Sequence, residues 1–133
     1  MDITVVQAKS VEQVSPPALI IDGLIGYSLR GAPRGSTARL IRWANGQQVP
    51  VLALDVPSGM DSTTGVAYNP VIRAAATLTL ALPKVGLMLD STRQQVGELY
   101  LADISVPPEL YQRPPLELEV GHLFAQSDII RLF

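Results

Sequence analysis

The chain of 133 residues has no cysteine and only one histidine, His122. Without cysteine it forms neither a disulfide framework nor a thiolate metal site, and a single histidine does not make a zinc cluster. The formal net charge of −2 argues against a nucleic-acid-binding surface as the main function. The apolar runs are too short to span a bilayer, and no signal peptide is visible at the start. The sequence therefore predicts a cytoplasmic protein that binds neither nucleic acid nor membrane, with a structural or exposed His122.

Charged residues are also few, at 17%, whereas 47% of the residues are hydrophobic. This composition is typical of a folded, well-packed protein and excludes a disordered chain. A length of 133 residues allows a real core, but it is short for a complete doubly wound enzyme. We therefore expect a single domain over residues 1–133.

Short apolar runs alternate with polar connections in the first two thirds of the chain. The predicted strands are residues 3–6, 18–21, 51–54, 77–82 and 97–102, with an edge strand at 114–120. Helices are predicted from Gly35–Ser36 to Asn45–Gly46, with a cap at Ser36 or Thr37, at 71–75 and from Ser127 onward. The uninterrupted apolar run at 18–21 is typical of a parallel strand buried on both faces. The alternation favours an α/β fold with a mainly parallel sheet.

Two loops follow two of these strands, and each begins with an aspartate, Asp22 or Asp55. The first continues through a glycine-rich stretch to residue 35, and the second reads Asp-Val-Pro-Ser-Gly over residues 55–59. In open parallel sheets ligands bind at the edge where strands end, and glycine lets the backbone approach a phosphate. The two loops together predict a site for a nucleotide-like ligand.

The first loop leaves alternatives open. Asp22 either caps the turn at Gly23 or supplies a carboxylate to a hard cation. Residues 26–31 have Gly-x4-Gly spacing but no following Lys-Ser/Thr, and Ser28 breaks the Gly-x-Gly-x-x-Gly pattern, so neither nucleotide motif is present. Arg30 and Arg34 lie within the loop, where they either contact phosphate or are simply solvated.

The second loop gives a stronger signal, because proline turns the chain sharply off the strand and leaves Ser58 facing the same edge. Ser58 is not expected to be a nucleophile, since the motif is not Gly-x-Ser-x-Gly and no histidine lies nearby. Lys84 leaves a third strand. It either supplies a charge or proton at the site or extends its amine to solvent.

Taken together, the motifs resemble the NAD(P)H-hydrate epimerase family, whose domain is called the YjeF N-terminal domain. The matching segments are Asp22–Gly26, Asp55–Gly59, Ala76–Thr79, Lys84–Leu87 and Asp103–Pro107. Their order and spacing agree with the family over roughly residues 18 to 108. The resemblance implies a Rossmann-like three-layer fold with a mainly parallel sheet.

The resemblance also implies an isomerase that interconverts the R and S forms of hydrated NADH and NADPH. It would serve a partner dehydratase that accepts only the S form. Asp22 and Ser58 would bind potassium, and Asp55 would contact the hydrated nicotinamide nucleotide and shuttle a proton. Lys84 would be a second catalytic residue, and it would supply a supporting charge beside Asp55. The residues expected to hold the substrate phosphates are Gly26, Tyr27, Ser28, Leu29, Arg30, Gly31 and Ala32.

The chain also departs from the family pattern. It has no Asn-Asn-Gly-Gly-Asp loop, which in the family supplies another potassium ligand, and Ser28 replaces a usual glycine. Ile3 corresponds to a strand well inside the family domain, so the sequence predicts a domain truncated at its N-terminus. Such a sheet has an open edge, which favours aggregation or a homodimer. The alternatives to an epimerase are a non-catalytic binding or dimerisation module, an inactive fragment, and a small nucleotide-binding protein of unrelated activity.

Overall fold

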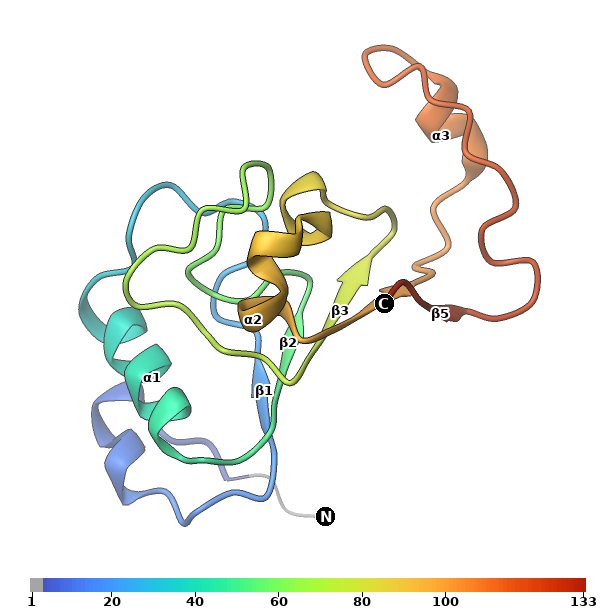
Figure 1. The fold of residues 1–133 in the computed structure, drawn as a ribbon. Coiled ribbons are helices and arrows are strands. Elements are labelled where there is room, and N and C mark those ends of the chain that lie inside the picture. The colour runs from blue at the N-terminus through green and yellow to red at the C-terminus, as the bar shows by residue number, and fades with distance from the viewer. Residues whose placement is uncertain (1–3) are drawn as a thin grey trace.

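A computed structural model describes residues 4–133 and contains one five-stranded sheet (Figure 1). The strands lie in sequence order: β1 Ile20–Asp22, β2 Val51–Leu54, β3 Ala76–Leu80, β4 Glu98–Ala102 and β5 Ile129–Arg131. β1 to β4 are parallel, and β5 pairs antiparallel with β4. The helical elements are η1 Ala8–Gln13, α1 Gly35–Gly46, η2 Val85–Met88, η3 Asp90–Thr92, α2 Arg93–Val96 and α3 Pro108–Gln112. The predicted α/β class with a mainly parallel sheet is confirmed.

The helix α1 forms where the sequence predicts it. Its buried residues are Ala38, Ile41 and Ala44, spaced three apart along one face. The predicted cap at Ser36 or Thr37 is wrong, because the helix already begins at Gly35, which has a φ of +57°, and the cap position falls at Arg34, two residues before Ser36. The residue before the helix is Arg34, and it makes no side-chain capping bond. The first N–H groups of α1 therefore lack an internal side-chain acceptor.

The helices α1 and α2 cover one face of the sheet. The pairing of β2, β3 and β4 places Ala53 and Leu99 in one row, on either side of Thr77. Ala53 packs with Ile41 of α1, and Leu99 packs with Val96 of α2. Because residues in one row point to the same face, α1 and α2 lie on the same side of the sheet.

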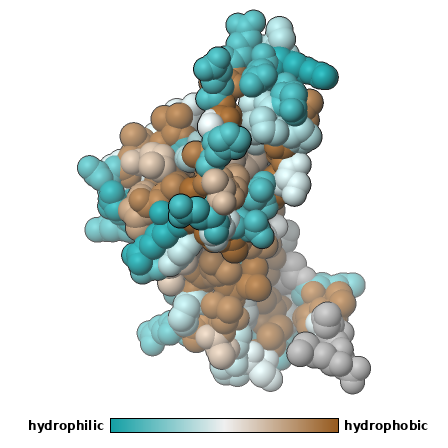
Figure 2. All heavy atoms as spheres, turned by 90° about the vertical axis from the view of Figure 1, so that its right-hand side faces the viewer, coloured by the Kyte–Doolittle hydropathy of each residue, from teal (hydrophilic) through white to brown (hydrophobic). Residues whose placement is uncertain are grey.

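The opposite face of β1 to β3 is open. Ile21 is 60% exposed and Leu54 is 38% exposed, and Leu52 and Leu78 between them are half-buried. Figure 2 looks onto this side of the molecule and shows hydrophobic surface gathered in its centre. The expectation that the strand at 18–21 is buried on both faces is thus wrong, because β1 is an edge strand covered on one side only. The described residues form two layers of the predicted three.

Other predicted elements are also wrong. Residues 71–75 are extended, since the Ile72 N–H donates to the Ser58 carbonyl and the Ala75 N–H donates to the Val51 carbonyl. The tail has no strand at 114–120 and no helix after Ser127, because residues 129–131 pair with β4 instead. Of the predicted strand at 3–6, residue 3 lies outside the described residues, and residues 4–6 join no strand of the sheet.

No helix within residues 4–133 is long and apolar enough to cross a membrane. The longest, α1, has 12 residues. The cytoplasmic location stays a prediction.

Candidate functional site

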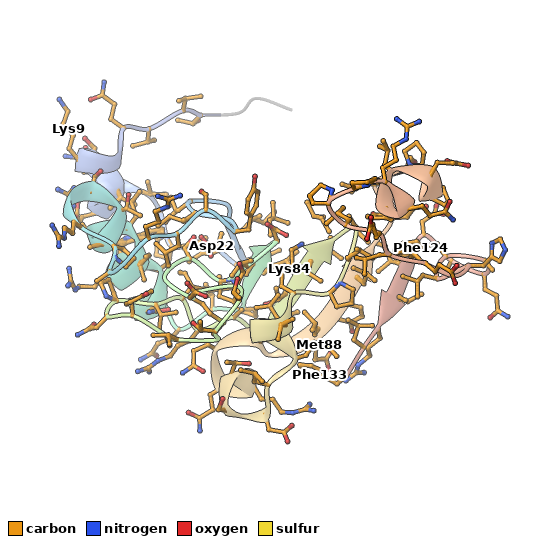
Figure 3. All side chains as sticks on the ribbon, turned by 90° about the horizontal axis from the view of Figure 1, so that it is seen from above. Lys9, Asp22, Lys84, Met88, Phe124 and Phe133 are labelled. Carbon is orange, nitrogen blue, oxygen red and sulfur yellow. The ribbon has the colours of Figure 1, made fainter. Side chains whose placement is uncertain are left out.

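The two aspartates lie at the edge where β1 and β2 end. Asp22 is the last residue of β1, and Asp55 directly follows β2. Lys84 comes from the loop after β3. Figure 3 looks down on this edge and shows Asp22 and Lys84 near the middle of the view, with Lys9 and Phe124 at opposite sides. The parallel sheet therefore gathers three sequence-predicted residues at one edge, as expected for strands of one direction.

Asp22 and Ser58 are bound to each other. The Ser58 hydroxyl donates to Asp22 Oδ1 at 2.7 Å, and the Ser58 N–H donates to Asp22 Oδ2 at 2.8 Å. The Ile25 N–H donates to Ser58 Oγ at 2.9 Å, and the Leu24 N–H donates to Asp22 Oδ1 at 3.3 Å. These contacts are compatible with both alternatives for Asp22. The carboxylate links the first loop to the second, and its oxygens lie beside Ser58 Oγ, as the ligands of a cation would.

The Asp22 carboxylate is buried, at 3% exposure, and has only neutral hydrogen-bond donors. None of the salt bridges formed within residues 4–133 includes it. Burying a charge without a counter-charge is costly, so a cation at this place would be favoured. The carboxylate and the serine oxygen suit a cation that prefers oxygen ligands, but they supply only part of a coordination shell. Among the residues described there is also no cluster of three histidine or acidic side chains suited to a metal.

Asp55 forms an ion pair with Lys84. The Lys84 Nζ lies 2.5 Å from Asp55 Oδ1 and also donates to the Leu80 carbonyl at 2.8 Å. The two side chains are 16% and 21% exposed. Lys84 therefore points toward Asp55 and not into solvent, whereas its supply of a charge or proton to a reaction stays a prediction. The Leu80 carbonyl is a contact that sequence reasoning missed, because no residue type signals a backbone acceptor.

The backbone at Asp55 adopts a φ of +67°, in the left-handed region that non-glycine residues rarely occupy. The Asp55 N–H donates to the Leu78 carbonyl of β3, so the neighbouring strand holds the residue in place. Gly26 lies against the carboxylate, since a Cβ on Gly26 would be 3.2 Å from Asp55 Oδ2. A Cβ at residue 26 would be in tighter than ordinary contact with this oxygen, so glycine lets the first loop lie close to Asp55.

The loop from Gly26 to Ala32 offers backbone donors to a ligand. Within the described part of the chain, none of its seven N–H groups donates an internal hydrogen bond. The loop leads into the uncapped start of α1, where the first N–H groups and the helix dipole favour an anion. Arg30 and Arg34 are exposed, and neither joins a salt bridge among residues 4–133. This combination can bind phosphate.

The conformation of the second loop depends on Gly59, and the motif alone did not explain why glycine is needed there. Gly59 has a φ of +102°, and a Cβ there would lie 2.4 Å from the Pro70 carbonyl oxygen. A larger residue would push the two chain segments apart. His122 lies elsewhere, in the wall of a cavity of about 420 Å³ on the C-terminal arm that also includes Tyr111 and Phe124.

Comparison with known families identifies the chain. The family model described as "YjeF-related protein N-terminus" matches residues 1–86. The chain belongs to this family. The family prediction made from the motifs is therefore confirmed.

Relatives in the YjeF-related family carry related names. A protein of Dehalogenimonas lykanthroporepellens named NAD(P)H-hydrate epimerase is 44% identical over 113 residues, which are 82% of this chain and 44% of the relative. A protein of Salinibacter ruber named bifunctional NAD(P)H-hydrate repair enzyme is 38% identical over 97 residues, 73% of this chain and 18% of the relative. The chain thus spans less than half the length of these relatives.

A solved structure of similar fold is that of yeast ynu0. It matches with a TM-score of 0.66 at 22% identity, over 86% of this chain and 46% of the yeast chain. At this identity the likeness supports the fold, and it agrees with the Rossmann-like class expected from the motifs.

Proposed function

We propose that this chain provides the catalytic edge of an NAD(P)H-hydrate epimerase, which interconverts the R and S forms of hydrated NADH and NADPH. The main support is the Asp55–Lys84 pair, which lies beside the glycine-rich loop and its free N–H groups. Relatives that are 35% to 44% identical to this chain over the aligned residues are named NAD(P)H-hydrate epimerase.

In this proposal Asp55 moves the proton. Epimerisation needs a hydroxyl group to leave one carbon as water and to return from the other side. A protonated carboxyl can give the leaving oxygen its proton, and the carboxylate can take a proton from the returning water. Lys84 is a positioning residue that holds the carboxylate through Asp55 Oδ1. Asp55 Oδ2 remains available to the substrate beside Gly26.

The substrate phosphates would bind at the loop from Gly26 to Ala32. The uncapped start of α1 and the side chains of Arg30 and Arg34 would add positive potential. We further propose that Asp22 and Ser58 are ligands of a potassium ion. When bound, this ion would neutralise the buried charge of Asp22 next to the anionic substrate. The remaining ligands would come from water, substrate or another part of the domain.

Partners follow from the same proposal. Relatives in Salinibacter ruber, Moorella thermoacetica and Pyrobaculum aerophilum are named bifunctional repair enzymes. We propose that this chain acts in nicotinamide nucleotide repair, beside a dehydratase that uses the S form, and that it does so in the cytoplasm. A homodimer stays a prediction.

The deciding experiment measures the interconversion of R and S hydrated NADPH by the purified chain, in potassium and in sodium buffer. Circular dichroism on the same sample reports folding. A rate above the uncatalysed one that falls in sodium would support the proposal. A folded chain without activity would favour the second candidate, a non-catalytic binding module. That candidate is supported by the hydrogen bonds that already occupy Asp22 and by the open face of the sheet.

A further inference from the structure

A hollow of about 490 Å³ lies beside the last turn of α1. Its walls include the end of α1, which precedes β2, together with Arg73, which precedes β3, and Gln95, which precedes β4. In Figure 1 the chain that leads into β3 runs beside α1. The hollow therefore lies toward the amino ends of the parallel strands, away from the carboxyl ends where Asp22 and Asp55 lie. It is not part of the candidate site described above.

The Asn45 side chain joins α1 to the chain before β3 at this hollow. Its Nδ2 donates to the Val71 carbonyl at 2.8 Å, and its Oδ1 accepts from the Arg73 N–H at 3.1 Å. One side-chain amide thus fixes the backbone that carries Arg73 against the helix that carries Arg42. Both arginines line the same hollow as a result, although they come from different elements.

The hollow is positively charged. Arg42 and Arg73 are its two charged residues, and none of the residues that line it is acidic. Both arginines are exposed, and neither forms a salt bridge within residues 4–133. The C-terminus of α1 adds partial negative charge equivalent to about half a unit, which is less than two full positive charges. An anion is therefore favoured here, in a chain whose net charge is −2.

Neutral polar side chains complete the lining. Tyr68 and Gln95 are half-buried and Asn69 is exposed, and none of the three side chains is held by a hydrogen bond within the described part of the chain. Amide and hydroxyl groups can bind the polar atoms of a small organic molecule, and the Tyr68 ring offers it a flat surface. The volume is within the range of about 300–1,000 Å³ that small-molecule sites have.

We propose that this hollow binds a small phosphorylated metabolite, with its phosphate group on Arg42 and Arg73. Guanidinium groups suit phosphate because their N–H groups match the spacing of its oxygens. Tyr68, Asn69 and Gln95 would contact the organic part of the molecule. The inference uses none of the residues assigned to epimerisation, so it does not depend on the proposed activity.

The test titrates the isotope-labelled full chain with AMP, inorganic phosphate or adenosine, and follows the backbone amide signals by NMR. AMP should shift the signals of Gly46, Tyr68 and Arg73 together and saturably. Phosphate should shift the same signals at higher concentration, and adenosine should leave them in place. The signals of residues 26–32 report the glycine-rich loop separately, so binding there is not mistaken for binding in the hollow.

Arg42→Gln and Arg73→Gln should each weaken AMP binding in the hollow by about 10-fold, because each removes a charged hydrogen-bond donor. Added salt should also weaken binding, since both arginines are exposed. Neither change should unfold the chain, because neither side chain forms a hydrogen bond or salt bridge within residues 4–133.

Arg113→Gln is the matched control. Arg113 directly follows α3, is exposed and joins no salt bridge among the described residues, so AMP binding should be unchanged in this variant. The proposal would be overturned if neither AMP nor phosphate shifted the three signals. It would also be overturned if adenosine bound as well as AMP, or if Arg42→Gln and Arg73→Gln bound AMP as tightly as Arg113→Gln.

Discussion

Asp22 and Asp55 take the same place on neighbouring strands, and their surroundings differ. The Asp22 carboxylate is almost fully buried and accepts only from neutral N–H and O–H groups. The Asp55 carboxylate is partly exposed, pairs with Lys84 and lies on a strained backbone. An aspartate at the end of a strand can therefore be buried among neutral donors, as Asp22 is, or paired with a cation, as Asp55 is. The donors around it decide whether it joins loops together or keeps an oxygen available for chemistry.

This difference predicts separate roles for the two loops. Asp22 has its two oxygens bound by the other loop, so its removal should affect stability most. Asp55 has one oxygen on Lys84 and the other beside Gly26, so its removal should affect catalysis most. Four substitutions test the contrast, and they follow in order of expected effect.

The largest effect is expected from Asp55→Asn. An amide cannot exchange the proton, so the epimerisation rate should fall by about 100-fold to 10,000-fold. Stability should fall by about 1–2 kcal/mol, because the side chains of this pair are only 16% and 21% exposed and asparagine keeps a neutral acceptor for Lys84. Rate assays and urea unfolding measure the two quantities. An active Asp55→Asn chain would exclude the proton role.

Asp22→Ala should reverse this pattern. It leaves the buried Ser58 N–H without its acceptor, and the free energy of unfolding should fall by about 2–4 kcal/mol. Asp22→Asn keeps one acceptor oxygen and should lose roughly half as much. Urea unfolding in potassium buffer measures both variants. If Asp22→Ala is as stable as the parent chain, the carboxylate does not join the loops.

Lys84→Met tests whether the ion pair at Asp55 matters for catalysis. Losing a hydrogen bond to a charged partner should lower the rate by about 10-fold to 100-fold in a folded protein. The matched control is Lys9→Met, because Lys9 is the other lysine, is exposed and lies far from the site in Figure 3. Lys84→Arg should recover part of the rate. An equal, small effect of Lys84→Met and Lys9→Met would remove Lys84 from the mechanism.

The smallest effect is expected at Asp61, a third aspartate in an exposed turn. Hydrogen bonds from the Thr64 and Thr63 backbone N–H groups hold the pKa of Asp61 below its ordinary value of 3.8. A lowered carboxyl pKa stabilises the folded state above the unfolded pKa, and this contribution is lost as the pH falls through the folded pKa. Asp61→Asn should therefore lower the urea midpoint slightly at neutral pH. The difference should vanish below the folded pKa, and a difference independent of pH would contradict this account.

Much of the fold and the content of the site could be predicted from sequence. The strand at 51–54 and the helix at 35–46 were predicted because apolar spacing and glycine positions act over a few neighbouring residues. The family was identified because its motifs combine glycine, proline and aspartate at positions where few other residues fit. Asp22, Ser58, Asp55 and Lys84 were selected for the same reason.

The features that the local sequence did not predict depend on contacts with residues distant in the chain. Residues 71–75 became extended because their N–H groups bond to Ser58 and Val51, and the tail became a strand because Ile129 lies opposite Ala102. Lys84 faced the site because Asp55, 29 residues earlier in the numbering, lies within reach of its amine. The sequence by itself thus determined which residues meet at the carboxyl ends of the strands. Only the tertiary structure decided which carboxylate met a cation and which face of the sheet stayed open, because both depend on what packs beside them.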